Sequence, residues 1–175
     1  MQAKSLSPTT VTRTDALRAV WKIIESTEPA PKPRKAAPTG NARVRTDETT
    51  SISNEKAIHF IKLGMPVQVI EPLSGYLGMG KGELIQILDM DRTTALRRSG
   101  KNQSLPKRSA ENVLRVLELD AMARDTFASE DEALAWLRRP HPLMDGDSPL
   151  AASSTSFGVN QVKEILVAIK YGGAV

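Results

Sequence analysis

The chain has 175 residues, of which 40% are hydrophobic and 4% aromatic, so it can bury an aliphatic core and is not a typical all-β sandwich. It contains no cysteine and two histidines, which argues against disulfide scaffolds, thiol nucleophiles and most metal sites. Its net charge is +4, and it contains neither an apolar run of membrane-spanning length nor a signal peptide, so we expect a cytoplasmic protein without membrane contact.

The first 50 residues are expected to form a flexible, basic arm. Apolar side chains at helical spacing predict a short, marginal helix over residues 14–26, whereas the proline-rich residues 29–40 predict an extended linker. We place the first ordered boundary near Ser51. The arm is either a solvated tail without a specific role or an additional electrostatic contact for DNA or for a partner.

Short helices separated by glycine and proline are predicted after this boundary. Two of them, over residues 81–88 and 92–100, are joined by the three-residue link 89–91. Asp91 is a favourable N-cap for the second helix, which is basic. Two short helices joined by a tight turn, with a basic second helix, are typical of a helix-turn-helix.

A strongly basic stretch covers this second helix and the residues after it. Residues 92–108 contain six Lys or Arg residues and no acidic residue. Basic side chains at this place in a helix-turn-helix can contact phosphates and base edges, although a merely solvated basic face is the alternative. The predicted DNA-binding residues are Arg92, Thr93, Thr94, Arg97, Arg98, Lys101, Lys107 and Arg108.

Further helices are predicted in the C-terminal part of the chain. The first begins after Pro106 and runs to Phe127. It is apolar on two sides and must bury both, so we expect it to pack under the DNA-binding part and also against the C-terminal part or a second copy of the protein. Another is expected over residues 130–139, and the last carries an apolar stripe that leads to Tyr171. Residues 121–175 contain five basic and seven acidic side chains, so this third is acidic whereas the rest is basic.

Several segments that look like catalytic or ligand motifs have simpler explanations. Residues 75–81 have the spacing of a phosphate-binding loop, but Gly82 stands where that loop needs Ser or Thr. The acidic residues 130–132 precede a helix, where negative charge complements the helix dipole. Residues 145–147 lack the other ligands of a calcium loop and predict a turn. We therefore expect no enzyme activity, no cofactor, no metal and no small-molecule substrate.

The chain resembles the Xre/MbcA/ParS antitoxins from about Ile58 onward, over roughly two thirds of its length. The first part of the resemblance is the helix-turn-helix and the serine-containing helix after it, and the second part is a spaced C-terminal signature. The motifs are Glu83-Leu84-Ile85, Arg92 to Arg98, Ser109 to Arg115, Phe127, Ala133, Trp136-Leu137, Pro140, Pro142-Leu143, Gly146, Ser148-Pro149-Leu150, Thr155, Gly158, Val162, Leu166, Ile169 and Tyr171-Gly172.

The resemblance implies an all-α fold, in which an Xre-like helix-turn-helix DNA-binding domain (51–118) is followed by a small helical toxin-binding domain (119–175). It also implies a homodimer. The partners of this family are RES-domain toxins, which consume NAD, and the antitoxin blocks the NAD pocket with its C-terminal helix and tail. The toxin-binding residues expected here are Trp136, Val162, Ile165, Ile169, Lys170, Tyr171, Gly172 and Gly173, the last four of them at the pocket.

The expected function is therefore that of an antitoxin that also represses its own operon by binding operator DNA. A basic middle part and an acidic C-terminal part suit two different partners. The alternative is a stand-alone helix-turn-helix transcription regulator whose C-terminal half serves only for dimerisation.

Overall fold

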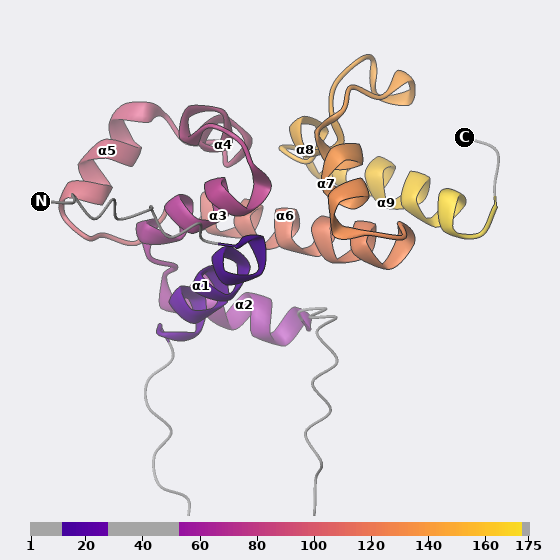
Figure 1. The fold of residues 1–175 in the computed structure, drawn as a ribbon. Coiled ribbons are helices and arrows are strands. Elements are labelled where there is room, and N and C mark those ends of the chain that lie inside the picture. Colours follow the sequence, from indigo (N-terminus) through magenta and orange to yellow (C-terminus); the bar gives the residue numbers. More distant parts are fainter. Residues whose placement is uncertain (1–11, 28–52, 173–175) are drawn as a thin grey trace, which may run out of the picture.

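The computed structural model describes residues 12–27 and 53–172, and within these ranges the fold consists of helices without a strand (Figure 1). The expected all-α fold is thus confirmed. The elements are α1 (Arg13–Glu25), α2 (Asn54–Leu63), η1 (Val67–Val69), α3 (Ile70–Leu77), α4 (Lys81–Ile87), α5 (Arg92–Gly100), α6 (Lys107–Thr126), α7 (Glu130–Arg138), η2 (Pro142–Met144), α8 (Pro149–Ala152) and α9 (Ser156–Lys170), where η denotes a short 3-10 helix.

Local sequence signals determine where many of these helices begin and end. The side chains of Ser129 and Thr155 accept hydrogen bonds from backbone N–H groups in the first turns of α7 and α9. Gly64 and Gly78 end α2 and α3 with positive φ angles of 90° and 61°, a conformation that favours glycine. The helices predicted from apolar spacing are found close to their expected positions.

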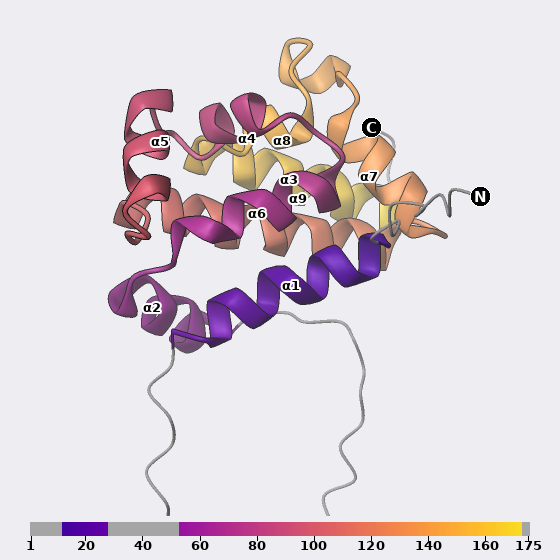
Figure 2. The ribbon, with the colours of Figure 1, turned by 60° about the vertical axis from the view of Figure 1, so that its left-hand side comes forward.

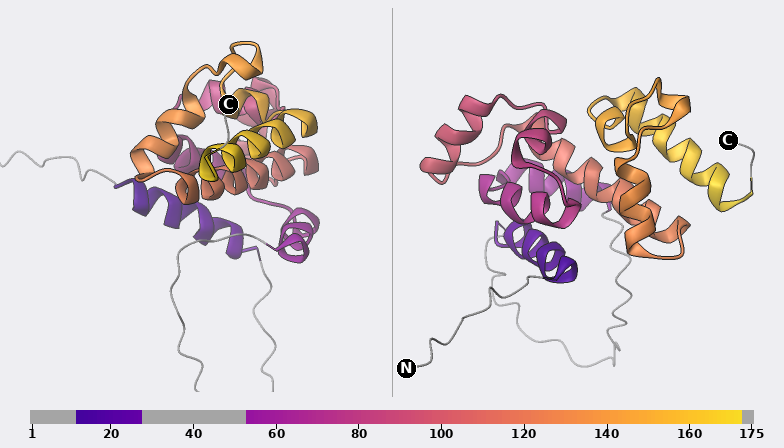
Figure 3. Two further views of the ribbon diagram at one scale, coloured as in Figure 1. Left: turned by 90° about the vertical axis from the view of Figure 1, so that its right-hand side faces the viewer. Right: turned by 45° about the horizontal axis from the view of Figure 1, so that its top comes forward.

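The long helix α6 forms the centre of the molecule, and α2, α7 and α9 pack against it (Figure 2). Both of its apolar sides are buried, as its sequence pattern predicts: Val113 and Leu117 lie on one side and Val116 and Leu119 on the other. The helices α3, α4 and α5 lie towards one end of α6, and α7 and α9 lie towards the other (Figure 3). The two groups of helices are therefore joined through one shared helix.

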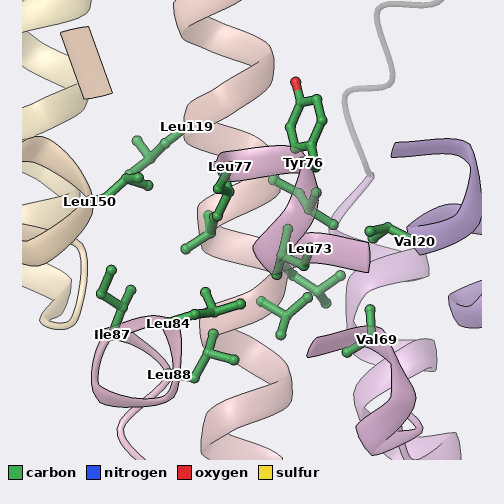
Figure 4. Close-up of a cluster of buried hydrophobic side chains, with 14 of the residues drawn as sticks. Val20, Val69, Leu73, Tyr76, Leu77, Leu84, Ile87, Leu88, Leu119 and Leu150 are labelled. Carbon is green, nitrogen blue, oxygen red and sulfur yellow. The ribbon is translucent and has the colours of Figure 1, made fainter. Parts of the chain in front are cut away.

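The N-terminal helix α1 belongs to the packed structure, which corrects the ordered boundary expected near Ser51. It lies against α3 and η1. Val20 and Ile24 are fully buried, and Figure 4 shows Val20 close to Val69 and Leu73. The amphipathic stripe of α1 thus packs on an apolar face formed by α3 and η1. The proline-rich residues 29–40 lie outside the described residues.

One hydrophobic cluster runs from α1 to α9. In the half near α5, Leu73, Leu84 and Leu88 meet between α3, α4 and α6, and Leu119 and Leu150 extend the cluster towards the C-terminal half (Figure 4). The core is built almost entirely from aliphatic side chains, as the composition predicts.

Candidate functional site

The turn between α4 and α5 is held by a few specific contacts. Asp89 adopts a positive φ of 52°, and the side chain of Met90 is buried beneath the turn. The carboxylate of Asp91 accepts a hydrogen bond from the Thr94 N–H at 2.7 Å. Hydrogen bonding to the side chain and backbone of Thr94 lowers the pKa of Asp91 below its ordinary value, so the cap is ionised at neutral pH. The turn therefore fixes the direction in which α5 leaves α4.

The outer face of α5 is basic and contains one large apolar side chain. Arg92, Thr93, Leu96, Arg97 and Gly100 are all exposed, and their spacing places them on one side of the helix. The opposite side carries the buried Ala95, which contacts the core. The helix is thus attached by one narrow stripe and presents the rest of its surface to solvent.

Two of the eight predicted DNA-binding residues are engaged within the protein. Arg98 donates through Nη1 to the backbone oxygen of Ser104 at 2.6 Å and ties the end of α5 to the following loop. Arg108 forms an ion pair with Asp89 at 2.5 Å and braces the turn. We therefore expect both side chains to be less available to a ligand than the sequence indicates.

The other predicted DNA-binding residues lie at the surface or partly at it. Four basic side chains are exposed and form no ion pair with any other part of the described chain: Arg92, Arg97, Lys101 and Lys107. Thr93 is exposed between them, and Thr94 is half-buried beside the cap. These side chains form a basic surface over α5 and the start of α6, which we call the α5 surface.

The last helix, α9, separates its apolar residues onto two faces. Val162, Ile165 and Leu166 are buried and hold the helix on α6. A second group lies outward: Phe157 is 88% exposed and Tyr171 is 78% exposed, with Val167 about half exposed between them. We call these three residues the outer stripe of α9. The apolar spacing in the sequence gives the buried face, but the outer stripe becomes evident only when Phe157 and Tyr171, which are 14 positions apart, are placed on the same side of the helix.

The expected toxin-binding residues are distributed over both faces. Val162 and Ile165 lie in the core and Ile169 is half-buried, so these side chains support α9 instead of forming its accessible surface. Their apolar character at helical spacing is explained by packing alone. Tyr171 and Gly172 are exposed, whereas Gly173 lies outside the described residues.

Lys170 forms an ion pair with Asp125 at the C-terminal end of α9. Hydrogen bonding to Asp125 raises the pKa of Lys170 above its ordinary value, so the ammonium group stays charged. This pair, together with a second one between Lys163 and Glu118, fastens the exposed side of α9 to α6. Both pairs lie at the surface, so the buried side chains Val162 and Leu166 contribute more to holding α9 on α6 than these pairs do.

Trp136 is half-buried in an aromatic group at the surface of α7. Its ring lies 5.6 Å from that of Phe127 and 5.9 Å from that of His141. A shallow hollow of about 290 Å³ is lined by Phe127, Trp136 and the side chain of Arg139, among others. His141 thus takes part in ring packing, and its Nδ1 accepts a hydrogen bond from the Leu143 N–H.

A buried polar group joins α3 to α6, and it was not identified in the sequence analysis. The Tyr76 hydroxyl lies 2.9 Å from both carboxylate oxygens of Asp120, and Arg124 donates to the same carboxylate at 3.0 Å. Burial, and then the charge of Asp120, raises the pKa of Tyr76 well above its ordinary value, so its hydroxyl is neutral. Burial also raises the pKa of Asp120, against the opposing effect of Arg124. No pattern in the sequence links residues that are 44 positions apart.

No cluster of three or more possible metal ligands occurs among the described residues. In the same part of the chain, none of the helices has the length and apolar character needed to cross a membrane.

The described residues thus form a small helical protein in which the α5 surface and the outer stripe of α9 are two separate exposed helix faces. Residues 122–172 match the C-terminal toxin-binding domain of the Xre/MbcA/ParS antitoxins. An antitoxin Xre from Photorhabdus laumondii subsp. laumondii is 25% identical over 111 residues, which cover 62% of this chain and 74% of that protein. These findings support an Xre/MbcA/ParS-type antitoxin of a toxin-antitoxin system, as the resemblance in the sequence indicates. The matched domain is described as one that binds a toxin.

Proposed function

We propose that this protein is an antitoxin that neutralises a RES-domain, NAD-consuming toxin with the end of α9, and that it represses its own operon through α5. The observation that carries the proposal is the separation of the two surfaces. The basic α5 surface lies at one end of the molecule, and the C-terminal end of α9 lies at the other (Figures 1 and 3). Two large partners can therefore be bound without competing for the same helix.

The toxin-directed part of the proposal rests on the matched domain and on the exposed end of α9. Tyr171 projects from the last turn with most of its surface in solvent, and Gly172 follows with a positive φ of 74°. A short segment that contains an aromatic ring and glycine can enter a narrow cleft. The RES identity of the toxin and occlusion of its NAD pocket are what the family resemblance implies, and the outer stripe of α9 is a surface suited to this contact.

The DNA-directed part rests on the two helices α4 and α5 and the charge on the second. A helix-turn-helix places the N-terminal residues of its second helix against base edges, while neighbouring basic residues contact phosphates. In this proposal Arg92 and Thr93, at the start of α5, contact base edges. The exposed residues Arg97, Lys101 and Lys107 contact phosphates. A homodimer would present two copies of α5 to the two half-sites of an operator.

The proposal predicts that variants at the two ends separate the two activities. We expect Tyr171→Ala to weaken toxin binding by about 30-fold, because truncating a central interface aromatic costs about 2 kcal/mol. Its affinity for DNA from upstream of its own reading frame should not change. Arg97→Ala should do the reverse and should reduce the slope of the salt dependence by about 0.9 per lost phosphate contact. The measurements are co-purification with the product of the adjacent gene, NAD consumption by that product, and DNA affinity at several salt concentrations.

Arg98→Ala is a useful comparison in the DNA measurement, because Arg98 is tied to the Ser104 backbone. A salt slope that is unchanged in Arg97→Ala would remove this residue from the DNA surface. Full protection against NAD loss by Tyr171→Ala would contradict occlusion by the end of α9. Specific DNA binding by a chain that forms no complex with the adjacent gene product would favour the stand-alone regulator.

A further inference from the structure

Leu96 is the one large apolar side chain on the outer face of α5, and it is 68% exposed. Its sequence neighbours on this face are Arg92, Thr93 and Arg97. On its other flank Leu96 borders a groove of about 440 Å³ between α5 and the segments η1, α3 and α4, which Arg92 and Ala95 also line. Single exposed leucines are common on protein surfaces, so exposure alone indicates no function. What distinguishes Leu96 is its place in the middle of a basic helix face.

The surroundings of Leu96 favour a nucleic acid over an apolar protein surface as its contact. Arg92 and Arg97 form no ion pair within the described chain, and an apolar partner would remove both guanidinium groups from water without compensation. Phosphates and base edges offer acceptors to both arginines. A partner that satisfies Leu96 together with its neighbours must therefore combine acceptors and negative charge with a small apolar group.

The major groove of DNA presents such a combination, since the 5-methyl group of thymine is its apolar feature. Leu96 lies one turn after Arg92, and helical leucine side chains lean towards the N-terminus of their helix. Its methyl groups are thus directed to the region of α5 that meets base edges in a helix-turn-helix. Gly100, the next residue along this face, has no side chain to hold the helix away from the groove, and a Cβ there would meet no atom within 4 Å.

We propose that Leu96 contacts a thymine methyl group and gives the protein a preference for thymine at that position of its operator. The inference rests on the proposed DNA binding by α5 and adds a residue that determines sequence preference. In this assignment the arginines supply affinity and register, whereas Leu96 distinguishes thymine from the other bases.

The test compares two versions of one DNA fragment from upstream of the protein's own reading frame, amplified with either dTTP or dUTP. Uracil keeps the pairing edge of thymine but lacks the 5-methyl group. We expect the wild-type protein to bind the uracil fragment about 4-fold more weakly per contact, which corresponds to about 0.8 kcal/mol for one buried methyl-sized group. Leu96→Ala should bind thymine DNA more weakly and should no longer distinguish the two fragments.

Two further variants control for unspecific effects. Arg97→Ala should bind both fragments more weakly but keep the wild-type ratio between them. Ile58→Ala removes another exposed apolar side chain, on α2 outside the α5 surface, and should change neither affinity. Thermal unfolding checks that Leu96→Ala is folded, which is expected because alanine favours helix at an exposed position.

The outcomes distinguish a failure of the proposed DNA binding by α5 from a failure of the role assigned to Leu96. If the wild-type protein binds neither fragment, DNA binding itself fails and the inference fails with it. Equal binding of both fragments by the wild type, or undiminished discrimination by Leu96→Ala, would overturn the role of Leu96 while leaving DNA binding intact. A changed oligomeric state or toxin affinity in Leu96→Ala, with the wild-type ratio between fragments, would instead assign Leu96 to a protein interface.

Discussion

At the scale of single residues, the contact between Tyr76 and Asp120 is a side-chain hydrogen bond buried in the core. Both residues have essentially no exposed surface, and they connect α3 with α6. Ionised or not, a buried carboxyl group needs partners, because a polar group removed from water without a hydrogen bond is costly. Tyr76 and Arg124 provide these partners from two sides.

Tyr76→Phe is therefore expected to destabilise the protein by about 1–3 kcal/mol, because it removes a hydroxyl donor from a buried acceptor and leaves the ring in place. Urea unfolding of the wild type and the variant measures this difference. Tyr171→Phe is the matched control: the hydroxyl it removes belongs to an exposed residue, so stability should stay within about 0.5 kcal/mol. Equal stability of Tyr76→Phe and wild type would show that Asp120 does not depend on the tyrosine.

At the scale of elements, the junction between α8 and α9 depends on the absence of one side chain. Gly158 lies in the first turn of α9, where its N–H donates to the Thr155 hydroxyl at 3.0 Å. A Cβ atom at this position would lie 1.9 Å from the backbone oxygen of Ala152. The two helices can approach this closely only because residue 158 is glycine.

Gly158→Ala should accordingly cost about 1–3 kcal/mol, towards the upper end of the range for overpacking, because the atom it meets is backbone and cannot rotate away. Gly75→Ala offers the opposite case within α3, since a Cβ there meets no atom within 4 Å. We expect that variant to gain up to about 1 kcal/mol from helix propensity. The midpoints of urea unfolding compare the two, and a tolerated Gly158→Ala would contradict the close approach of α8 and α9.

Helix positions could be predicted from the sequence because their signals are local, whereas the use of each helix face could not. Asp91 and Gly78 act within one turn of the residues they affect. The start of α5 and the end of α3 can therefore be predicted from the local sequence. The apolar stripe of α9 could also be predicted from the sequence. Its residues, such as Val162, were expected to contact a toxin, whereas in the structure Val162 is buried in the core. A helix uses its main apolar stripe first for its own core, so in the proposed complex we expect the toxin to meet the opposite side, where Tyr171 lies.

The intramolecular partners of individual basic residues could not be predicted from the sequence either. Arg98 and Arg108 belong to the same basic stretch as Arg97, yet the first two contact the Ser104 backbone and Asp89. These contacts depend on how the loop after α5 folds back, which charge patterning does not specify. The basic stretch therefore indicates where basic side chains gather but not which of its arginines are engaged within the protein.

At the scale of the whole molecule, a single core joins two surfaces that face different ways. The hydrophobic cluster is continuous from α1 through α6 to α9, so neither half has a separate core. A toxin bound at the end of α9 would leave the α5 surface uncovered, since the two lie at opposite ends of the protein (Figure 1). The arrangement is compatible with a toxin-antitoxin complex that still reaches DNA.

The packing of α1 extends this core to a helix that precedes a proline-rich segment of the sequence. Ile24 is fully buried, and α1 covers α3 and η1, which support the α5 end of the molecule. Ile24→Ala should destabilise the protein by about 2–5 kcal/mol, the range for truncating a buried isoleucine. Lys22→Ala, at an exposed position of the same helix, should stay within about 0.5 kcal/mol of the wild type. Urea unfolding distinguishes the two, and equal stability of both variants would mean that α1 lies outside the cooperative core and that the boundary near Ser51 is correct after all.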